Sequence, residues 1–299
     1  MPKSKEYDIA FIGHMCFDEI IPFGGKGTVA PGSAVLCGAM VAARVGKRVA
    51  AVVKMSPKDK RILKPLKDAG VDIHLIPAAA TTYSRVEHET EDIDQRRITI
   101  VRTAGRFRIG EVPKLHARNI HLAGISDSEF DMDLLRSLKA RGGHLSVDMQ
   151  SFVRQIDPQT HEITFADVAD KKDIVRLMDK VKLDVVEARL LTGTEDLAQA
   201  ARIIEEWGCP EVVITQAQGV LARAGGKTYY EKFSNHGIAG RTGRGDTTFA
   251  AYLSRRMEHS PEDSLKFAAA LVSIKMESPG PFQGTLEDVF QRMRDGHAG

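Results

Sequence analysis

The residues best suited to chemistry lie in one glycine-rich segment toward the carboxyl end of the chain. The segment reads Gly-Arg-Thr-Gly-Arg-Gly-Asp, ends at Asp246 and runs directly into a helical pattern. Gly243 and Gly245 allow backbone conformations that point successive N–H groups outward, and a helix start adds unpaired N–H groups and a positive dipole end. The segment therefore predicts an anion hole. Asp246 at its mouth could take the proton from an attacking hydroxyl during phosphoryl transfer.

Two common nucleotide-binding motifs are missing from the sequence. The segment lacks the Gly-Lys-Ser/Thr ending of a Walker A loop, and no Gly-x-Gly-x-x-Gly follows the first predicted strand. A dinucleotide-dependent dehydrogenase is therefore remote. Helix capping would explain Asp246 alone, but not two glycines, Thr242 and two arginines within seven residues.

The elements that must position this segment alternate between strand and helix. Short β-rich apolar runs predict strands at 9–12, 49–53, 73–76, 120–123, 145–147, 183–186 and 212–214. Helical patterns that end at a glycine lie between them at 33–45, 57–69 and 194–207. These βαβ units predict an α/β fold with a Rossmann-like, doubly wound, mostly parallel sheet. Two antiparallel edge strands, at 220–222 and 227–233, and three helices that open near 247, 260 and 285 complete the chain.

Two stretches break this alternation, because they are strand-like where a crossover helix is expected. They cover residues 16–28 and 82–104. We predict that they form a small β-sheet lid that closes over a ligand. Residues 1–15, 29–81 and 105–299 would then form the α/β nucleotide- and substrate-binding domain. A surface hairpin without function is the alternative.

Composition limits the partners of the protein. The 299 residues are 42% hydrophobic and 27% charged, as in an ordinary folded protein, and the net charge is +2 without a basic patch. Nucleic acid is therefore not an expected partner. The three cysteines lack metal or disulfide spacing, as do the histidines at 14, 88, 121 and 144, and the first strand is too short for a signal peptide or membrane span. We expect a cytoplasmic protein with no membrane association.

Several segments together resemble the ribokinase family of carbohydrate kinases, also called the PfkB family. Residues 240–246 are similar to the family signature Asp-Thr-x-Gly-Ala-Gly-Asp. Further similar segments are 13–18, the glycine-rich 31–38 with 43–46, the Asn-x-x-Glu-like 183–188 with Leu-Thr-Gly at 191–193, and 212–220. The resemblance spans nearly the whole chain. It implies a kinase that uses ATP and Mg²⁺, and it leaves a requirement for K⁺ open.

The resemblance also implies roles for the matched residues. Asp246 would be the base, and the backbone at Gly243, Arg244 and Gly245 would bind the transferring phosphoryl group. The other implied contacts are Asp18, Gly32, Ser33 and Asp246 for the hydroxyl acceptor, Thr215, Gly219, Thr242, Gly243 and Gly245 for the nucleotide, and Asp184 and Glu187 for Mg²⁺ through water. Asp148, at the end of a predicted strand, is a further candidate for the acceptor. It could instead bond the turn that follows, through Gln150 or Ser151.

The sequence departs from the family pattern at several of these positions. Gly240 replaces an aspartate, and Arg244 replaces an alanine, so a cation could assist transfer directly or turn to solvent or a neighbouring carboxylate. Asp184 replaces an asparagine and adds negative charge near the metal. Leu36 stands where a sugar-binding asparagine is usual, and the turn at 216–218 lacks its glycine.

The predicted function is ATP-dependent phosphorylation of a hydroxyl on a small sugar, polyol or cyclitol. A nucleoside kinase of the same family is the alternative, since the loss of the asparagine at position 36 leaves the acceptor pocket open to either class. A non-catalytic sugar or nucleotide sensor is less favoured, because a binding protein has no need of the base Asp246. Pairing of lid strands between subunits makes a homodimer the favoured assembly.

Overall fold

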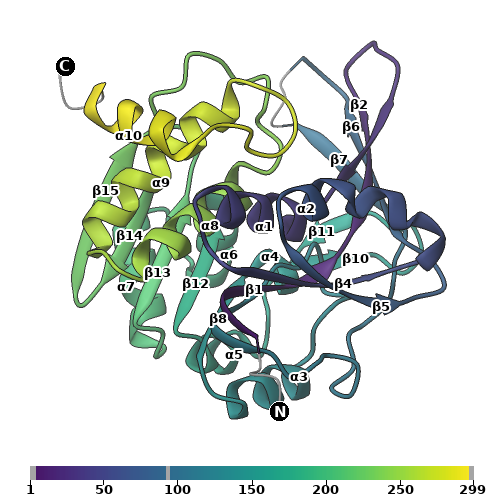
Figure 1. The fold of residues 1–299 in the computed structure, drawn as a ribbon, viewed down its shortest axis with the longest axis horizontal. Coiled ribbons are helices and arrows are strands. Elements are labelled where there is room, and N and C mark those ends of the chain that lie inside the picture. The colour runs from purple at the N-terminus through teal and green to yellow at the C-terminus, as the bar shows by residue number, and fades with distance from the viewer. Residues whose placement is uncertain (1–4, 92–94, 296–299) are drawn as a thin grey trace.

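The structure is a computed structural model that describes residues 5–91 and 95–295. The predicted segments that include residues 1–4, 92–94 or 296–299 extend beyond this described part. Its centre is a nine-stranded sheet (Figure 1). From one edge to the other the strands are β15 (Lys227–Lys232), β14 (Gly219–Ala224), β13 (Glu211–Thr215), β12 (Lys180–Asp184), β9 (His144–Asp148), β8 (His116–Leu122), β1 (Glu6–His14), β4 (Val49–Met55) and β5 (Asp72–Pro77). All neighbours from β13 to β5 pair in parallel, whereas β13, β14 and β15 pair antiparallel. The prediction of a doubly wound, mostly parallel sheet is confirmed.

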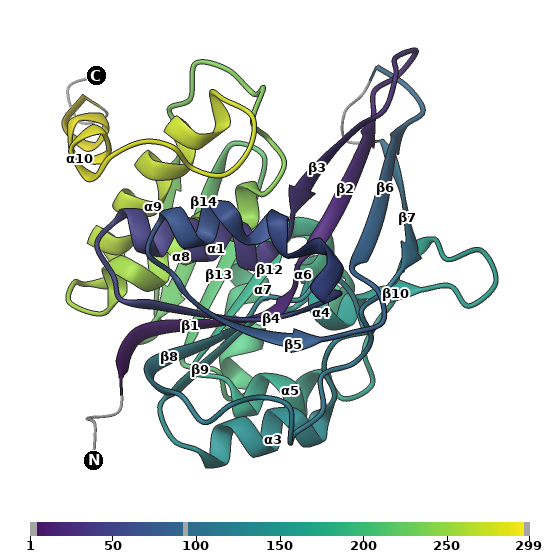
Figure 2. The same cartoon turned by 45° about the vertical axis from the view of Figure 1, so that its right-hand side comes forward.

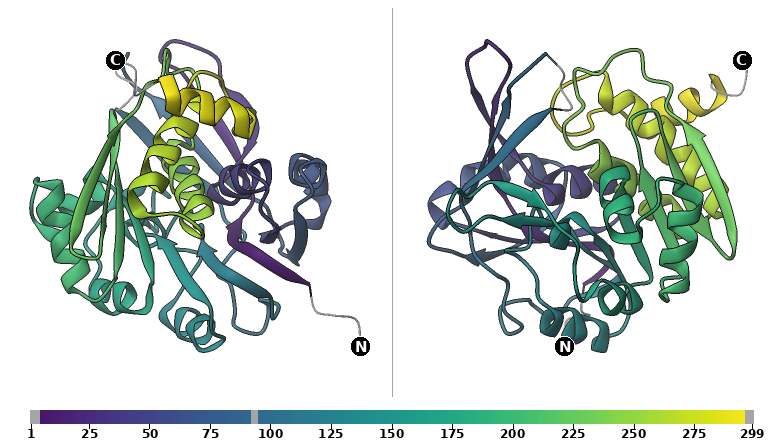
Figure 3. Two further views of the ribbon diagram at one scale, coloured as in Figure 1. Left: turned by 60° about the vertical axis from the view of Figure 1, so that its left-hand side comes forward. Right: turned by 180° about the vertical axis from the view of Figure 1, so that it is seen from behind.

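Helices cover both faces of this sheet, as the side and back views show (Figure 3). One face carries α1 (Ala34–Arg44), the 3-10 helix η1 (Pro57–Leu63), α2 (Lys64–Asp68), α8 (Arg244–Arg256), α9 (Pro261–Met276) and α10 (Leu286–Asp295). The other carries α3 (Met132–Ala140), α4 (Gln150–Val153), α5 (Lys171–Leu177), α6 (Val185–Thr192) and α7 (Leu197–Glu206). Alternation along β1 separates the two cores: Ile9 and Phe11 pack toward α1 and α8, whereas Ala10 and Ile12 pack toward the α3 side.

The small β-sheet rises from one end of the large sheet (Figure 2). Its strands are β3 (Thr28–Gly32), β2 (Cys16–Ile21), β6 (Thr82–His88) and β7 (Arg96–Arg102), with a parallel pair β2–β6 at its centre. The predicted boundary at residue 28 was wrong, because β3 continues the lid to Gly32. Antiparallel pairing of β2 with β3 returns the chain to the large sheet at the start of α1, which explains why the lid runs that far.

A two-stranded hairpin supports the lid from the side of the large domain. It consists of β10 (Arg154–Ile156) and β11 (Ile163–Phe165), which the sequence did not predict. The Ile100 N–H donates to the His161 carbonyl at 2.9 Å, and Thr99 forms a bridge with Glu162. The hairpin therefore holds β7 next to the carboxyl ends of the parallel strands.

Two predicted elements end differently in the structure. The strand expected at 183–186 stops at Asp184, and α6 begins at Val185, because the Asp184 and Glu187 side chains each accept from the other's backbone N–H in a capping box. The helix expected at 57–69 is η1 followed by the short α2, with non-helical dihedrals at Asp59.

One buried histidine makes the stability of this fold depend on pH. His121 on β8 stacks edge-on against Phe11 and against Phe249 of α8, with ring centroids 5.7 and 5.1 Å apart. Burial lowers the pKa of His121 to about 3. The unfolded chain takes up a proton at this residue below pH 6.5 and the native protein does not, so the native state loses stability as the pH falls.

We expect His121 alone to remove about 2 kcal/mol of unfolding free energy between pH 8 and pH 5, at 1.36 kcal/mol per pKa unit. Urea unfolding of the native protein and of a His121→Phe variant at both pH values measures this contribution. The native protein should lose more stability on acidification than the variant. Equal losses in the two proteins would contradict this.

Candidate active site

The glycine-rich segment forms a tight turn that leads straight into α8. Gly243 has a φ of 78°, in the left-handed region, and it is the N-cap of α8, so the helix begins at Arg244 rather than at the predicted Thr247. The first helical hydrogen bond joins the Thr247 N–H to the Gly243 carbonyl at 2.9 Å. Gly245 and Asp246 therefore belong to the first helical turn, where backbone N–H groups lack helical partners. The Arg244 N–H donates to the Arg241 carbonyl at 3.1 Å, so the predicted anion hole is left with the N–H groups of Gly245 and Asp246 at this helix start.

Two neighbouring elements fix the position of this turn. A Cβ on Gly243 would lie 2.6 Å from Cys37 Sγ of α1, and one on Gly245 would lie 2.9 Å from Lys182 Nζ of β12. A side chain at either position would therefore require Cys37 or Lys182 to shift. The sequence therefore needs glycine at 243 for its backbone angle and at both positions for space.

We expect Gly243→Ala to destabilise the native state by roughly 1–3 kcal/mol, from the left-handed backbone cost and overpacking against Cys37. A Cys37→Ala substitution removes the sulfur that the new Cβ would meet, and it leaves the backbone strain in place. The double variant should therefore regain part of the loss, which a double-mutant cycle of urea unfolding measures. Strict additivity of the two substitutions would show that the Cys37 contact does not constrain the turn.

A buried ion pair lies beneath the turn. Lys182 Nζ donates to Asp148 Oδ2 at 2.8 Å, and both side chains are almost fully buried. Burial raises the pKa of Asp148, and the charge of Asp246 raises it further while that of Lys182 opposes. The Gln150 N–H also donates to Asp148 Oδ1 at 3.1 Å. The structure therefore shows the alternative in which Asp148 bonds the turn that follows it. Contact between Asp148 and the acceptor stays a prediction.

The two predicted magnesium residues meet at the start of α6. The Glu187 N–H donates to Asp184 Oδ1 at 2.9 Å, and the Asp184 N–H donates to Glu187 Oε2 at 2.8 Å. Glu187 is fully buried, and its Oε1 has no hydrogen-bond partner, although Arg154 Nη2 is 3.6 Å away. Burial and the neighbouring Asp184 raise the pKa of Glu187 to about 8.

This pair of carboxylates fits Mg²⁺ held through water. The unpartnered Oε1 of Glu187 is a suitable acceptor for a metal-bound water. Within the described ranges, no group of three or more His, Cys, Asp or Glu side chains could hold a metal directly. The role of Asp184 and Glu187 as magnesium residues stays a prediction.

Cationic side chains converge on the same edge of the sheet. Four of them lie close enough to Asp184 for its charge to act on them: Arg96, Arg154, Lys182 and Arg244. Burial acts to lower the pKa of Arg154, but the charges of Glu187 and other carboxylates have the larger effect, so its pKa is raised. Arg96 is exposed on β7 of the lid, so the lid contributes a cation to the site. The arrangement can bind several phosphate oxygens at once.

Arg244 links the anion-hole turn to the neighbouring strands. Its Nη1 donates to the Ala217 carbonyl at 3.4 Å, in the turn between β13 and β14. Burial and the charge of Arg241 lower the pKa of Arg244 to about 10, so it remains charged at neutral pH. Its guanidinium is thus held within the site region rather than turned fully to solvent.

The predicted acceptor residues lie together at the base of the lid. A Cβ on Gly32 would lie 1.8 Å from Asp18 Oδ2, so the Asp18 carboxylate rests directly on the Gly32 backbone. Ser33 has a φ of 147°, which is rare for a residue with a side chain, and its Oγ accepts the Leu36 N–H at 3.0 Å. Burial raises the pKa of Asp18.

A buried cysteine joins this acceptor side to the catalytic turn. Cys37 is buried, and burial together with the charge of Asp246 raises its pKa to about 12, with Asp18 adding to the shift. Asp18 and Asp246 therefore face the same thiol from opposite segments of the chain. The structure brings these two predicted residues into one site.

The predicted nucleotide-binding residues lie in different environments. Thr215 is buried, and its Oγ1 donates to the Leu183 carbonyl at 3.4 Å. A Cβ on Gly245 would lie 3.6 Å from Thr215 Oγ1. Thr242 is exposed within the turn. Gly219 lies at the start of β14, where a Cβ would meet the Glu231 carbonyl at 2.5 Å, so strand packing accounts for this glycine. Nucleotide contacts by these residues stay predictions.

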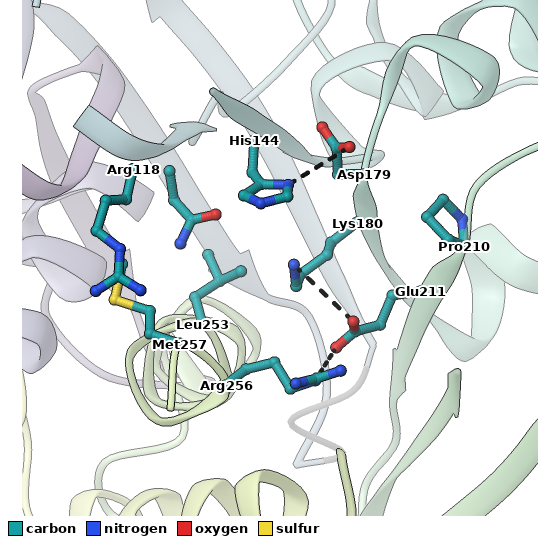
Figure 4. A pocket seen from close by; sticks show the side chains of 10 residues that line it. Arg118, His144, Asp179, Lys180, Pro210, Glu211, Leu253, Arg256 and Met257 are labelled. Carbon is teal, nitrogen blue, oxygen red and sulfur yellow. Dashed lines mark hydrogen bonds and ion pairs between the residues drawn. The ribbon is translucent and has the colours of Figure 1, made fainter. Parts of the chain in front are cut away.

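A separate pocket lies at the other end of the sheet (Figure 4). It is lined by residues at the amino ends of β8, β9, β12 and β13, together with Arg256 and Met257 near the end of α8. Figure 4 shows Glu211 joined to Arg256 and to Lys180; these ion pairs measure 3.0 and 3.9 Å. This pocket does not contain the anion hole, and we assign no chemistry to it.

Four functional candidates were missed by the sequence analysis: Lys182, Arg96, Arg154 and Lys275. Lys182 is a lysine inside an otherwise apolar strand, a pattern that demands a buried partner and could have been noticed. Arg96 begins β7, Arg154 begins β10 and Lys275 lies on α9, and only folding brings these residues to the site. No local signal marks any of the three.

At one edge of the parallel sheet lie a glycine turn, a helix start and a carboxylate, beneath a small β-sheet. This arrangement defines a phosphotransferase of the ribokinase-like class. The chain belongs to the pfkB family of carbohydrate kinases, whose family model matches residues 7–287. The prediction of the family is confirmed.

Individual relatives differ in donor and acceptor. A cytidine kinase of Thermococcus kodakarensis is 28% identical over 259 residues, which cover 83% of this chain and 87% of that relative. A pyrophosphate-dependent kinase in the ribokinase family, solved with a pyrophosphate analogue and myo-inositol, is 30% identical with a TM-score of 0.86, and the match covers 95% and 99% of the two chains. A ribokinase of Arabidopsis thaliana, solved with ribose and ATP, shares the fold at 18% identity, a TM-score of 0.77 and coverage of 97% and 99%. None of the helices in the described ranges is long and apolar enough to cross a membrane.

Proposed function

We propose that this kinase phosphorylates a hydroxyl of a cyclitol or similar small polyol, with Asp246 as general base. Asp246 takes the proton of the attacking hydroxyl as its oxygen bonds to the terminal phosphorus of the donor. The bond between that phosphorus and the bridging oxygen breaks, and the remaining phosphate leaves with its electron pair. The observation that carries this proposal is the position of Asp246 in the first turn of α8, beside unpaired N–H groups.

The donor that we favour is pyrophosphate rather than the ATP predicted from sequence. Arg244 reaches across to the Ala217 carbonyl, in the turn that the family resemblance assigns to the nucleotide. A guanidinium there suits phosphate oxygens and offers no apolar surface for a base. The pyrophosphate-dependent relative at 30% identity supports the same donor. ATP is the second candidate, since it is the donor bound in the ribokinase that shares this fold.

The acceptor we favour is a hydroxylated ring without a base. Asp18 supplies a half-buried carboxylate for hydroxyl groups, and the apolar Leu36 offers no polar contact at position 36. The relative solved with myo-inositol supports a cyclitol. A nucleoside acceptor is the alternative that the cytidine kinase relative favours.

The other predicted components belong to the same proposal. Mg²⁺ would lie near Asp184 and Glu187, where it would neutralise charge on the donor phosphates. A homodimer through the lid is supported by exposed Val29 and Val101 on its two edge strands.

A matrix of donors and acceptors tests the proposal. Pyrophosphate and ATP are each combined with myo-inositol, simple sugars and nucleosides in the presence of Mg²⁺, and acceptor-dependent release of phosphate or ADP is measured. We expect the fastest turnover with pyrophosphate and a cyclitol. Fast turnover with ATP and a nucleoside alone would replace the proposal by nucleoside kinase activity.

A further inference from the structure

A buried lysine lies directly behind the anion-hole turn. Lys275 belongs to the last turn of α9 and is 2% exposed. Its Nζ donates to the backbone carbonyls of Gly240 and Thr242, both of which belong to the glycine-rich segment. The lysine therefore connects the end of α9 to the residues that precede the anion hole.

The turn is packed so closely on α9 that its first residue must be glycine. A Cβ on Gly240 would lie 1.9 Å from the Ser278 carbonyl oxygen and 2.5 Å from that of Lys275. The Gly240 N–H donates to the Met276 carbonyl at 2.8 Å. Position 240, where the family has an aspartate, thus has no room for a carboxylate, and carbonyl oxygens surround it instead.

These carbonyls make an environment that favours a cation. The final carbonyls of α9 carry the negative end of its dipole, and those of Gly240 and Thr242 accept from the ammonium. Rings of backbone carbonyls are also the ligands that replace water around monovalent cations in proteins. Lys275 thus fills, with its own charge, a place that suits a monovalent ion.

The charge of Lys275 needs an explanation, because its two acceptors are neutral. An ammonium buried without a carboxylate on it is costly, and an apolar side chain of similar length would pack at least as well. Burial lowers the pKa of Lys275, whereas the charge of Asp246 acts in the opposite direction. Asp246 therefore lies within electrostatic reach of the lysine.

We propose that Lys275 is a positioning residue whose ammonium serves as a fixed internal cation for the anion-hole turn. It holds the carbonyls of Gly240 and Thr242 toward α9, which leaves the N–H groups of Gly245 and Asp246 in the first turn of α8 directed at the phosphoryl group. The protein therefore needs no added monovalent cation such as K⁺. This inference rests on the proposed function of the same site.

The first test uses the unaltered protein. Thermal unfolding and phosphoryl transfer are measured in tetramethylammonium chloride, whose cation is too large for such a site, and again in KCl at equal ionic strength. We expect the same melting temperature and the same turnover in both salts. A clear rise of either quantity in KCl would overturn the proposal.

Variants at position 275 test the role of the charge. Lys275→Ala leaves room for an ion, and we expect turnover to fall by about 10²-fold, as when one donor of an oxyanion site is lost. KCl or ammonium chloride should raise both its melting temperature and its turnover. Lys275→Met fills the space without charge, so it should lose turnover and respond to neither salt.

Lys266→Ala, at a part-exposed lysine of the same helix, is the matched control and should behave as the unaltered protein does. If no acceptor supports turnover, the melting temperatures still decide the role of Lys275 separately from the proposed function. Salt-independent melting of Lys275→Ala, or full activity of Lys275→Met, would contradict the role of an internal cation.

Discussion

Replacing Asp246 by asparagine is expected to lower kcat by about 10²–10⁴-fold, the usual contribution of a general base. Asparagine keeps the size of the side chain at the first turn of α8 but cannot take up the proton of the attacking hydroxyl. The substitution also removes a negative charge beside the anion hole. Binding of an anionic donor should therefore be unchanged or tighter, which separates loss of the base from loss of binding.

The measurement pairs steady-state kinetics with calorimetric binding of pyrophosphate in the absence of an acceptor. Asp173→Asn on α5 is a matched control, because Asp173 is largely exposed and forms a surface ion pair with Arg176 at 2.9 Å. The control should keep full activity. A kcat for Asp246→Asn within threefold of the unaltered protein would remove Asp246 from the role of base.

Replacing Arg244 by alanine is expected to lower kcat/KM for pyrophosphate by about 10²–10³-fold, as for loss of a charged donor in a preorganised anion site. Of the three positions predicted to bind the transferring phosphoryl group, 243 to 245, Arg244 has a side chain that could follow that group, whereas Gly243 and Gly245 would act through their backbones. Lysine restores the charge but not the paired N–H donors of a guanidinium, so Arg244→Lys should be intermediate. The effect should be larger with pyrophosphate than with ATP, which has further contacts through its nucleoside.

Kinetics of both variants with each donor measure this difference. Arg202→Ala on α7 serves as the control, since Arg202 is 57% exposed and 3.8 Å from its partner Glu206. An equal or larger loss with ATP would contradict the assignment of Arg244 to the pyrophosphate site.

The periodicity of apolar residues predicted the large sheet because each of its strands is marked by its own local sequence. Runs of apolar β-branched residues form the buried parallel strands, and glycines end the helices at 46, 70 and 208 with left-handed dihedrals. The lid was predicted for the same reason, from strand-like residues in place of a helix. The extension of the lid through β3 escaped prediction, because its pairing with β2 is a contact between strands and not a property of either one.

The glycine turn and its aspartate were visible in the sequence because the turn is local. The charged residues that surround the turn could not be predicted from the sequence, because Arg96, Arg154 and Lys275 come from three distant segments. The capping box of Asp184 and Glu187 shows a second limit. The same carboxylates that suit a metal also satisfy the N–H groups of α6, and sequence spacing does not separate these two uses.

We propose that Asp246 is the base for phosphoryl transfer to a hydroxylated acceptor in this site. Phosphorus NMR of the protein with Mg²⁺, pyrophosphate and myo-inositol follows the bond that forms, with ATP and further acceptors in parallel samples. The predicted result is a phosphate monoester signal that requires the acceptor, grows with the unaltered protein and is nearly absent with Asp246→Asn. No monoester from any donor and acceptor, or equal growth with the variant, would contradict the claim.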